Sequence, residues 1–215
     1  MSSFDLTVPS GWLRLDPRDP DPATLERLAS PQARGVSRPD WDAVGAALIG
    51  QLQQMCVSLA ESGSLIVLMT DPTNPLALWQ PIISLGHVTW VEGVEPMAVL
   101  AGLTANDPSA HVYPLEIAVA VRTHTSASVP TTDLGAAASR LGASNMGGLI
   151  ARDELDGLVI TREQFRYLIG IPSDAQAWVE ATCVATVPRL PEQPDPMPML
   201  QELFDDLLGS FEWTP

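Results

Sequence analysis

The sequence predicts an α+β fold, an antiparallel sheet of about six strands covered by helices in an arrangement close to an αβα sandwich. Strand-like segments follow one another between residues 149 and 187, separated by short turns. Two other segments carry apolar residues at helical spacing, and they need a sheet or a helix to cover. The length of 215 residues and the hydrophobic content of 46% fit a folded protein. We expect a single domain over residues 1–215.

The first thirty residues predict two short strands and a helix. Residues 4–8 and 12–15 alternate apolar with polar side chains and are separated by a Pro-Ser-Gly turn. Asp21 is a suitable N-cap for a helix that begins at Pro22 and ends near Ser30.

The strongest helical pattern covers residues 40–61. Apolar side chains recur there at steps of three and four, which predicts a packed amphipathic helix with Gly63 at its C-terminal cap. They are Trp41, Val44, Leu48, Leu52, Met55 and Leu59. Residues 64–70 then predict a strand that is buried on both faces, and the loop 71–75 ends it.

Further strands are expected at residues 82–91 and 115–123. In the second of these, Leu115, Ile117, Val119 and Val121 predict the core face, and the alternate residues up to Arg122 predict a more exposed face. Residues 97–103 fit either a strand or a helical turn.

The second half of the chain predicts a short helix, a meander and a closing helix. The helix covers residues 133–141, and a Gly/Ser/Asn loop follows it. Strands at 149–155 and 158–165 flank Asp156-Gly157, a dipeptide suited to a two-residue hairpin turn. A turn at 172–175 joins 167–171 to 178–187. A proline-rich linker at 188–198 leads to a helix at 199–208. Its apolar face comprises Leu200, Leu203, Phe204, Leu207 and Leu208.

The charge distribution argues against nucleic acid as a partner. The chain holds 26 acidic and 11 basic residues, a net charge of −15, and every basic residue is arginine. Apart from two histidines, no basic side chain occurs between Arg38 and Arg122. Phosphate backbones and anionic membrane surfaces are bound mainly through lysine and arginine, so we exclude both as partners.

The same sequence predicts neither a membrane span nor a signal peptide. No apolar run approaches the roughly 18 residues that a membrane span needs, and the N-terminus lacks the basic and apolar regions of a signal peptide. Cys56 and Cys183 lie far apart in apolar patterns, which predicts buried, inert thiols. We expect a cytoplasmic protein.

Motifs for catalysis, metals and cofactors are missing. Neither GxxxxGK[ST] nor GxGxxG occurs, and GxSxG, HExxH and the EF-hand spacing are also absent. His87, His111 and His124 are scattered, so only the fold could assemble them into a metal site. We therefore expect no enzyme activity, no metal and no cofactor.

Two stretches supply candidate partner-binding residues. The first is the loop after the buried strand, with Asp71, Asn74 and Trp79. The second is the tail from residue 191 to 215, which has no basic residue and suits a basic protein partner. Its candidates are Glu202, Asp205, Asp206 and Trp213. Without a partner, the adjacent Asp205 and Asp206 would simply form a solvated acidic face.

Four features together resemble one known family. They are an opening strand that ends Val8-Pro-Ser-Gly-Trp12, a buried strand at 65–69 that runs into a proline-rich loop, the meander, and a closing segment at 204–213. This pattern resembles the PsbP-like proteins, whose fold is shared with a Ran-binding nuclear-import factor and several bacterial lipoproteins. The resemblance implies a binding or assembly factor with no shared catalytic residues. For a GC-rich bacterial relative, to which the missing lysine points, it also implies an association with a specialised secretion system.

The sequence leaves two functions open. The first is a non-enzymatic cytoplasmic interaction or assembly factor, which the missing motifs, the acidic charge and the resemblance favour. The alternative is a small-ligand-binding or enzymatic domain with a pocket between sheet and helices, lined by Asp71, Asn74 and a histidine.

Overall fold

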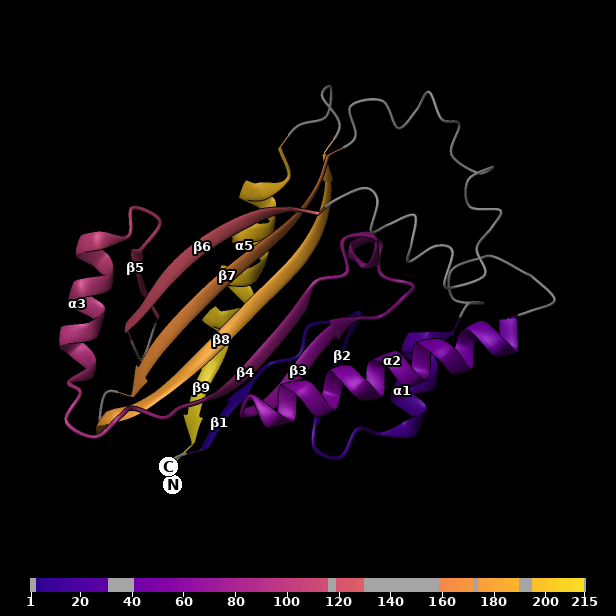
Figure 1. Cartoon of the computed structure of the whole chain (residues 1–215), viewed down its shortest axis with the longest axis horizontal. Helices are drawn as coiled ribbons and strands as arrows, with labels where there is room; N and C mark the ends of the chain where they lie inside the picture. The colour runs from indigo at the N-terminus through magenta and orange to yellow at the C-terminus, as the bar shows by residue number, and fades with distance from the viewer. Residues whose placement is uncertain are drawn as a thin grey trace.

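The computed structural model describes residues 3–30, 41–115, 119–129, 159–171, 174–189 and 195–214 (Figure 1). A seven-stranded antiparallel sheet has the strand order β2-β3-β4-β8-β7-β6-β5, and a separate ribbon pairs β1 with β9. The α+β prediction is confirmed. The sheet comprises β2 (Trp12–Leu15), β3 (Ser64–Thr70), β4 (Ile82–Val88), β5 (His111–Pro114), β6 (Val119–Val129), β7 (Val159–Ile171) and β8 (Asp174–Arg189). The ribbon comprises β1 (Ser3–Leu6) and β9 (Phe211–Thr214), and the helices are α1 (Pro22–Ala29), α2 (Trp41–Glu61), η2 (Pro75–Trp79, a 3-10 helix), α3 (Pro96–Asn106) and α5 (Met197–Gly209).

Helices cover the two faces of the sheet unequally. Helix α5 and the ribbon lie on one face, over the main core that contains Phe165, Tyr167 and Phe204. On the other face α1 and α2 pack near β2 and β3, whereas α3 packs at the opposite end near β6, β7 and β8. Figure 1 shows α2 and α3 in front of the sheet at its two ends, with α5 behind it. Between α2 and α3, no described helix covers the strands.

Helices α1 and α2 begin and end close to the predicted positions. The Asp21 carboxylate accepts the Thr24 backbone N–H at 3.0 Å, as an N-cap should. The apolar side chains that recur at helical spacing along α2 are only half-buried where they are described. The N-terminal part of the helix extends past the strands (Figure 1). Leu52 and Leu59 reach the core cluster around Leu25 and Val67.

The prediction for residues 115–123 is correct only in part, because Leu115 and Val121 are buried as expected whereas Val119 is not. Strand β6 begins at Val119, which is exposed, whereas Ala120 is fully buried on the side of α5. Arg122 lies on that same side and reaches α5. Because both faces of this strand are partly covered, the alternation of valine with smaller residues did not identify the side of the main core.

The closing helix was predicted correctly, and the strand after it was not predicted. Leu200, Phe204, Leu207 and Leu208 of α5 are buried. The chain then continues into β9, where Phe211 stacks on Phe4 with ring centroids 5.5 Å apart. The linker prediction needs one correction, because β8 continues through residues 188–189.

The predicted meander is confirmed where it is described, since β7 pairs with β8, and β7 also pairs with β6, which the prediction did not include. Residues 159–171 form one strand, although the sequence predicted two shorter ones, and it pairs with both neighbours. Residues 97–103, for which the sequence left two alternatives, belong to helix α3. The predicted helix at 133–141, its following loop, the strand at 149–155 and the Asp156-Gly157 turn lie outside the described residues, and the single domain stays a prediction.

Candidate functional site

The loop after β3 is tied into the fold by its own polar side chains. Asp71 is buried and accepts from the backbone N–H and the hydroxyl of Thr73 at 2.9 and 2.6 Å. These bonds, with Arg27 alongside at 2.5 Å, lower the pKa of Asp71. Asn74 caps η2 by accepting from Leu76 N–H at 2.9 Å, and its amide donates to the Gly11 carbonyl at 3.1 Å. Asp71 and Asn74 thus stabilise the loop, and a partner-binding role for them stays a prediction.

The tryptophan candidates lie within or beside packed structure. Trp79 is half-buried and packs against the main core. Trp213 belongs to β9, where its register partner is Phe4. Trp79 therefore adds little to an exposed apolar surface, and a partner-binding role for either tryptophan stays a prediction.

The three acidic candidates on α5, Glu202, Asp205 and Asp206, do not share one environment. Glu202 and Asp206 are exposed, as a solvated or partner-binding face requires. Asp205 instead points into the protein: its carboxylate lies 2.6 Å from Arg122 Nη1 and accepts from the Tyr167 hydroxyl at 2.7 Å. The interpretation of Asp205 as part of a solvated face is therefore wrong. A residue at the boundary between the buried and exposed faces of α5 can point toward the sheet or toward solvent. Asp205 points toward the sheet because its partners Arg122 and Tyr167 lie on β6 and β7.

Replacing Asp205 with asparagine should lower the free energy of unfolding by about 2 kcal/mol, because charged hydrogen bonds to Arg122 and Tyr167 are lost in a mostly buried place. Asp206→Asn is the matched control and should change the free energy of unfolding by less than about 0.5 kcal/mol. Urea titration of both variants measures this. Equal effects would show that the Asp205 contacts do not stabilise the fold.

A second buried polar cluster surrounds Glu163 on β7. The Glu163 side chain is fully buried, and its two oxygens accept from His124 Nε2 at 2.9 Å, Ser126 Oγ at 3.0 Å and Arg189 Nη2 at 2.8 Å. Burial would raise the pKa of Glu163, but the donors around it prevail and lower it. Arg189 also reaches Asp195 at 3.1 Å, just before α5. The cluster joins three strands to the start of α5, and sequence reasoning missed it because its members are far apart along the chain.

Both thiols are buried, as predicted. Cys56 lies on α2, and Cys183 lies in the main core on β8. Burial raises the pKa of each thiol. We expect Ellman's reagent to label the two thiols of the native protein only as fast as the protein unfolds locally or globally. In denaturant it should label both thiols at once. Rapid labelling of the native protein at neutral pH would contradict this.

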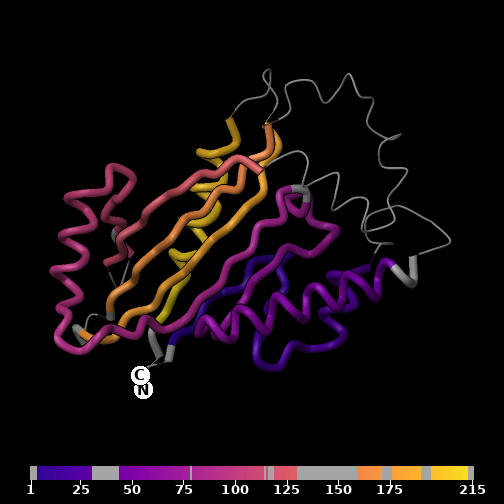
Figure 2. The backbone as a smooth tube through the Cα atoms, in the orientation of Figure 1, coloured from indigo at the N-terminus to yellow at the C-terminus, as the bar shows by residue number. Residues whose placement is uncertain are grey.

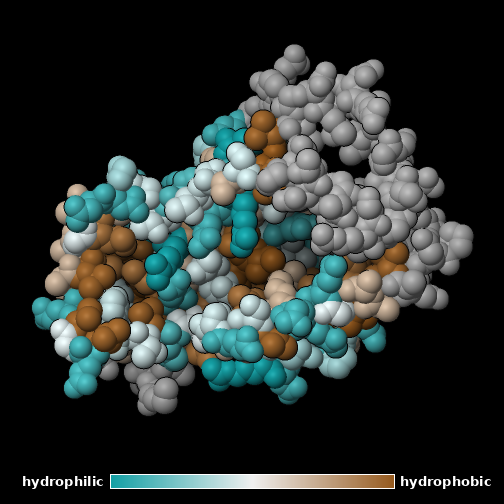
Figure 3. Space-filling view, in the orientation of Figure 1, coloured by the Kyte–Doolittle hydropathy of each residue, from teal (hydrophilic) through white to brown (hydrophobic). Residues whose placement is uncertain are grey.

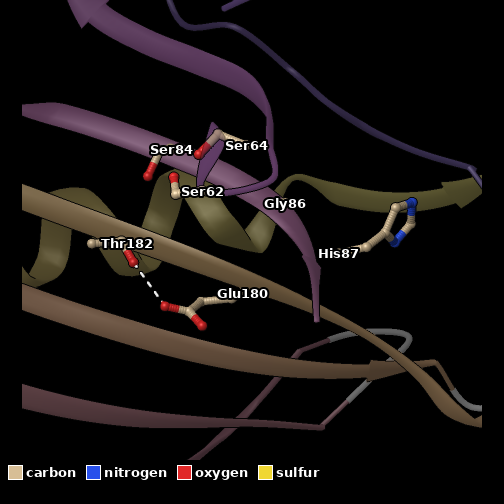
Figure 4. Close-up of a pocket in the computed structure, with 7 residues that line it drawn as sticks. All are labelled: Ser62, Ser64, Ser84, Gly86, His87, Glu180 and Thr182. Atoms are coloured by element: carbon tan, nitrogen blue, oxygen red, sulfur yellow. Dashed lines mark hydrogen bonds between the residues drawn. The ribbon is translucent and has the colours of Figure 1, made fainter. Parts of the chain in front are cut away.

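A polar hollow lies on the uncovered part of the sheet, beside the C-terminal end of α2. It has a volume of about 150 Å³ and is bordered by residues of β3, β4, β8 and the turn between α2 and β3 (Figure 4). They are Ser62, Ser64, Ser84, Gly86, His87, Glu180 and Thr182. The sequence predicted a pocket between sheet and helices lined by Asp71, Asn74 and a histidine, and this hollow is not that pocket. It has a histidine at its border, but Asp71 and Asn74 lie at the opposite end of β3 and do not line it.

Helix α3 presents an apolar outer surface. None of its eleven residues is charged, and only Pro96 and Leu100 are buried. Met97 is 60% exposed and Val99 is 41% exposed, and Val91, just before the helix, is 74% exposed. We call Val91, Met97 and Val99 the α3 patch. Figure 3 shows apolar side chains gathered at the end of the molecule where Figure 1 places α3.

Two exposed carboxylates lie next to the α3 patch. Glu92 follows Val91, and Glu95 is the N-cap residue of α3 but makes no capping hydrogen bond with its side chain. Both carboxylates therefore remain available to an approaching cation. The sequence pattern did not reveal this surface, because a segment that is apolar all round is ordinarily buried.

Two features are absent from the described residues. No group of three or more His, Cys, Asp or Glu side chains there could hold a metal ion. Among the described helices, none combines the length and the apolar character that crossing a membrane would take.

No protein-family model and no curated protein sequence matches this chain. Among solved structures, the crystal structure of LpqN, described as involved in cell envelope biogenesis of Mycobacterium tuberculosis, matches with 16% sequence identity. The match covers 100% of this chain and 85% of that one, with a TM-score of 0.42. A likeness at this level carries no argument about function, and none of these comparisons shows a PsbP-like family.

Proposed function

We propose that this protein is a non-enzymatic interaction or assembly factor whose protein partner binds the α3 patch. The observation that carries the proposal is a helix with no charged residue whose outer side chains remain exposed. Large exposed apolar surfaces bordered by polar groups are typical of interaction sites. The carboxylates of the buried Glu163 and the partly buried Asp205 are occupied by internal partners, which fits a role without catalysis.

The residues around the patch support one kind of partner. Glu92 and Glu95 border the patch, and no arginine or lysine lies between Arg38 and Arg122. We infer an apolar partner segment flanked by lysine or arginine, because complementary charge speeds encounter and selects among partners. A second copy of this chain would bring acidic borders together, and each copy carries a net charge of −15.

Several finer assignments remain part of this proposal. The exposed Glu202 and Asp206 on α5 are a second acidic surface for the same kind of basic partner. A cytoplasmic location, a PsbP-like ancestry and an association with a specialised secretion system are compatible with an assembly factor, and we retain them as proposals.

Photo-crosslinking in the native cells identifies the partner. A photoreactive amino acid at position 97 or 99 should yield a defined adduct that is absent when the same group replaces the exposed Val57 on α2. The partner found in this way should bind the Met97→Ser, Val99→Ser double variant about tenfold more weakly. Val57→Ser is the matched control and should bind like the wild type.

The acidic border has its own test. Glu92→Gln with Glu95→Gln should slow association roughly tenfold at low salt and flatten its salt dependence. Glu202→Gln with Asp206→Asn tests the α5 surface in the same assay. The proposal fails if positions 97 and 99 give no specific adduct, or if sedimentation shows a dimer that Met97→Ser dissolves.

A further inference from the structure

The polar hollow beside α2 arises from a close backbone approach between two glycines. At Gly86 a Cβ atom would lie 2.5 Å from the Gly63 carbonyl oxygen, so no larger residue fits without moving the chain. Gly63 itself has a φ of +89°, which glycine adopts without strain. These two glycines bring the turn between α2 and β3 against β4 and place Ser62 and Ser64 beside Ser84 (Figure 4).

Two hydroxyl groups in the hollow lack a protein partner. Ser64 is only 7% exposed and borders the hollow, yet neither Ser64 nor Ser84 makes a side-chain hydrogen bond within the part of the chain that the structure describes. Both hydroxyls are open to the hollow and are not enclosed by protein, so they are free to bond a ligand that displaces water from it. Across the hollow, Thr182 donates to Glu180 at 3.1 Å, which orients that carboxylate (Figure 4).

The charge in and around the hollow is balanced. Glu180 pairs with Arg166 at 2.7 Å, so the carboxylate does not leave a net charge for a ligand to neutralise. His87 borders the hollow, but its ring points away from the serines in Figure 4 and packs edge-on against Phe4. The side chains that face the hollow are therefore hydroxyls and one neutralised carboxylate. Hydroxyl groups both donate and accept, and they pair best with ligands that do the same.

We propose that this hollow binds a neutral, hydroxyl-rich molecule the size of one sugar ring. Cavities of about 150 Å³ hold a six-membered ring, and the hollow has about this volume. Ser64 and Ser84 bond ligand hydroxyls, and the Glu180 carboxylate accepts a hydrogen bond from a further ligand hydroxyl. This site lies on β3, β4 and β8, and it does not depend on the α3 patch.

NMR titration of the isotope-labelled full chain tests the proposal. The probes are neutral glucose, mannose, galactose, arabinose and myo-inositol, with glucuronate and glucosamine as charged analogues. At least one neutral probe should give saturable shifts at the backbone amides of Ser64, Ser84 and Thr182. The Ser64→Ala, Ser84→Ala double variant should bind that probe at least about tenfold more weakly.

Thr186→Val is the matched control, because Thr186 lies on β8 four residues beyond Thr182 and outside the hollow. It should leave the affinity unchanged. Absence of saturable shifts with every neutral probe, shifts confined to another surface, or tighter binding of a charged analogue would each overturn the proposal. Serine-to-alanine changes remove no packing, so a folded variant is expected, and its amide spectrum verifies that.

Discussion

Replacing Phe204 with alanine should lower the free energy of unfolding by about 3–5 kcal/mol. Phe204 is fully buried, and its ring meets that of Phe165 on β7 at a centroid distance of 5.5 Å. It lies at the centre of the surface by which α5 covers the sheet, so the substitution would leave a cavity that neighbouring side chains fill only in part. Guanidinium titration followed by tryptophan fluorescence gives the value.

Met199→Ala is the control for this prediction on the same helix. Met199 is 46% exposed, so its truncation should cost less than about 1 kcal/mol. Similar losses for the two variants would mean that α5 does not pack on the sheet through Phe204.

Replacing Glu163 with glutamine should cost about 3 kcal/mol at neutral pH, because it removes a buried charge on which Arg189 and His124 both depend. The effect should depend on pH. Folding lowers the pKa of Glu163. The contribution of its carboxylate to the free energy of unfolding is therefore complete above the pKa of the unfolded state, about 4.3, and is lost as the pH falls through the pKa of the folded state.

Unfolding titrations at several pH values between about 3 and 7 measure that dependence. The difference between wild type and Glu163→Gln should shrink toward the acid end. Glu202→Gln is the surface control and should show almost no difference at any pH. A Glu163→Gln deficit that persists undiminished in acid would contradict the assigned role of the ionised carboxylate.

Local signals in the sequence predicted most elements well. The Asp21-Pro22 pair marked the start of α1, and the apolar spacing at 200–208 identified α5 and its buried face. These features depend on a few neighbouring residues, so the sequence can show them. The pairing of β9 with β1 could not be predicted in this way, because it joins the two ends of the chain.

The candidate sites were harder to predict than the fold. Asp205 and Asp206 are adjacent in sequence, yet one is paired inside and the other is exposed, since only Asp205 meets Arg122 and Tyr167. Ser64 and Ser84 carry no motif and come together only because two glycines let the chain approach closely. Such sites depend on tertiary contacts between distant segments, which periodicity and composition do not encode.

The ribbon also determines how the molecule should respond to mechanical force. Ser3 is paired with Thr214 and Leu6 with Phe211, so both chain ends leave from the same end of the ribbon, side by side in Figure 2. A pull on the two ends therefore loads the ribbon's hydrogen bonds one after another, as in opening a zipper, and never all together in shear. The ribbon should yield at low force and uncover Phe4 and Phe211 while the seven-stranded sheet is still intact.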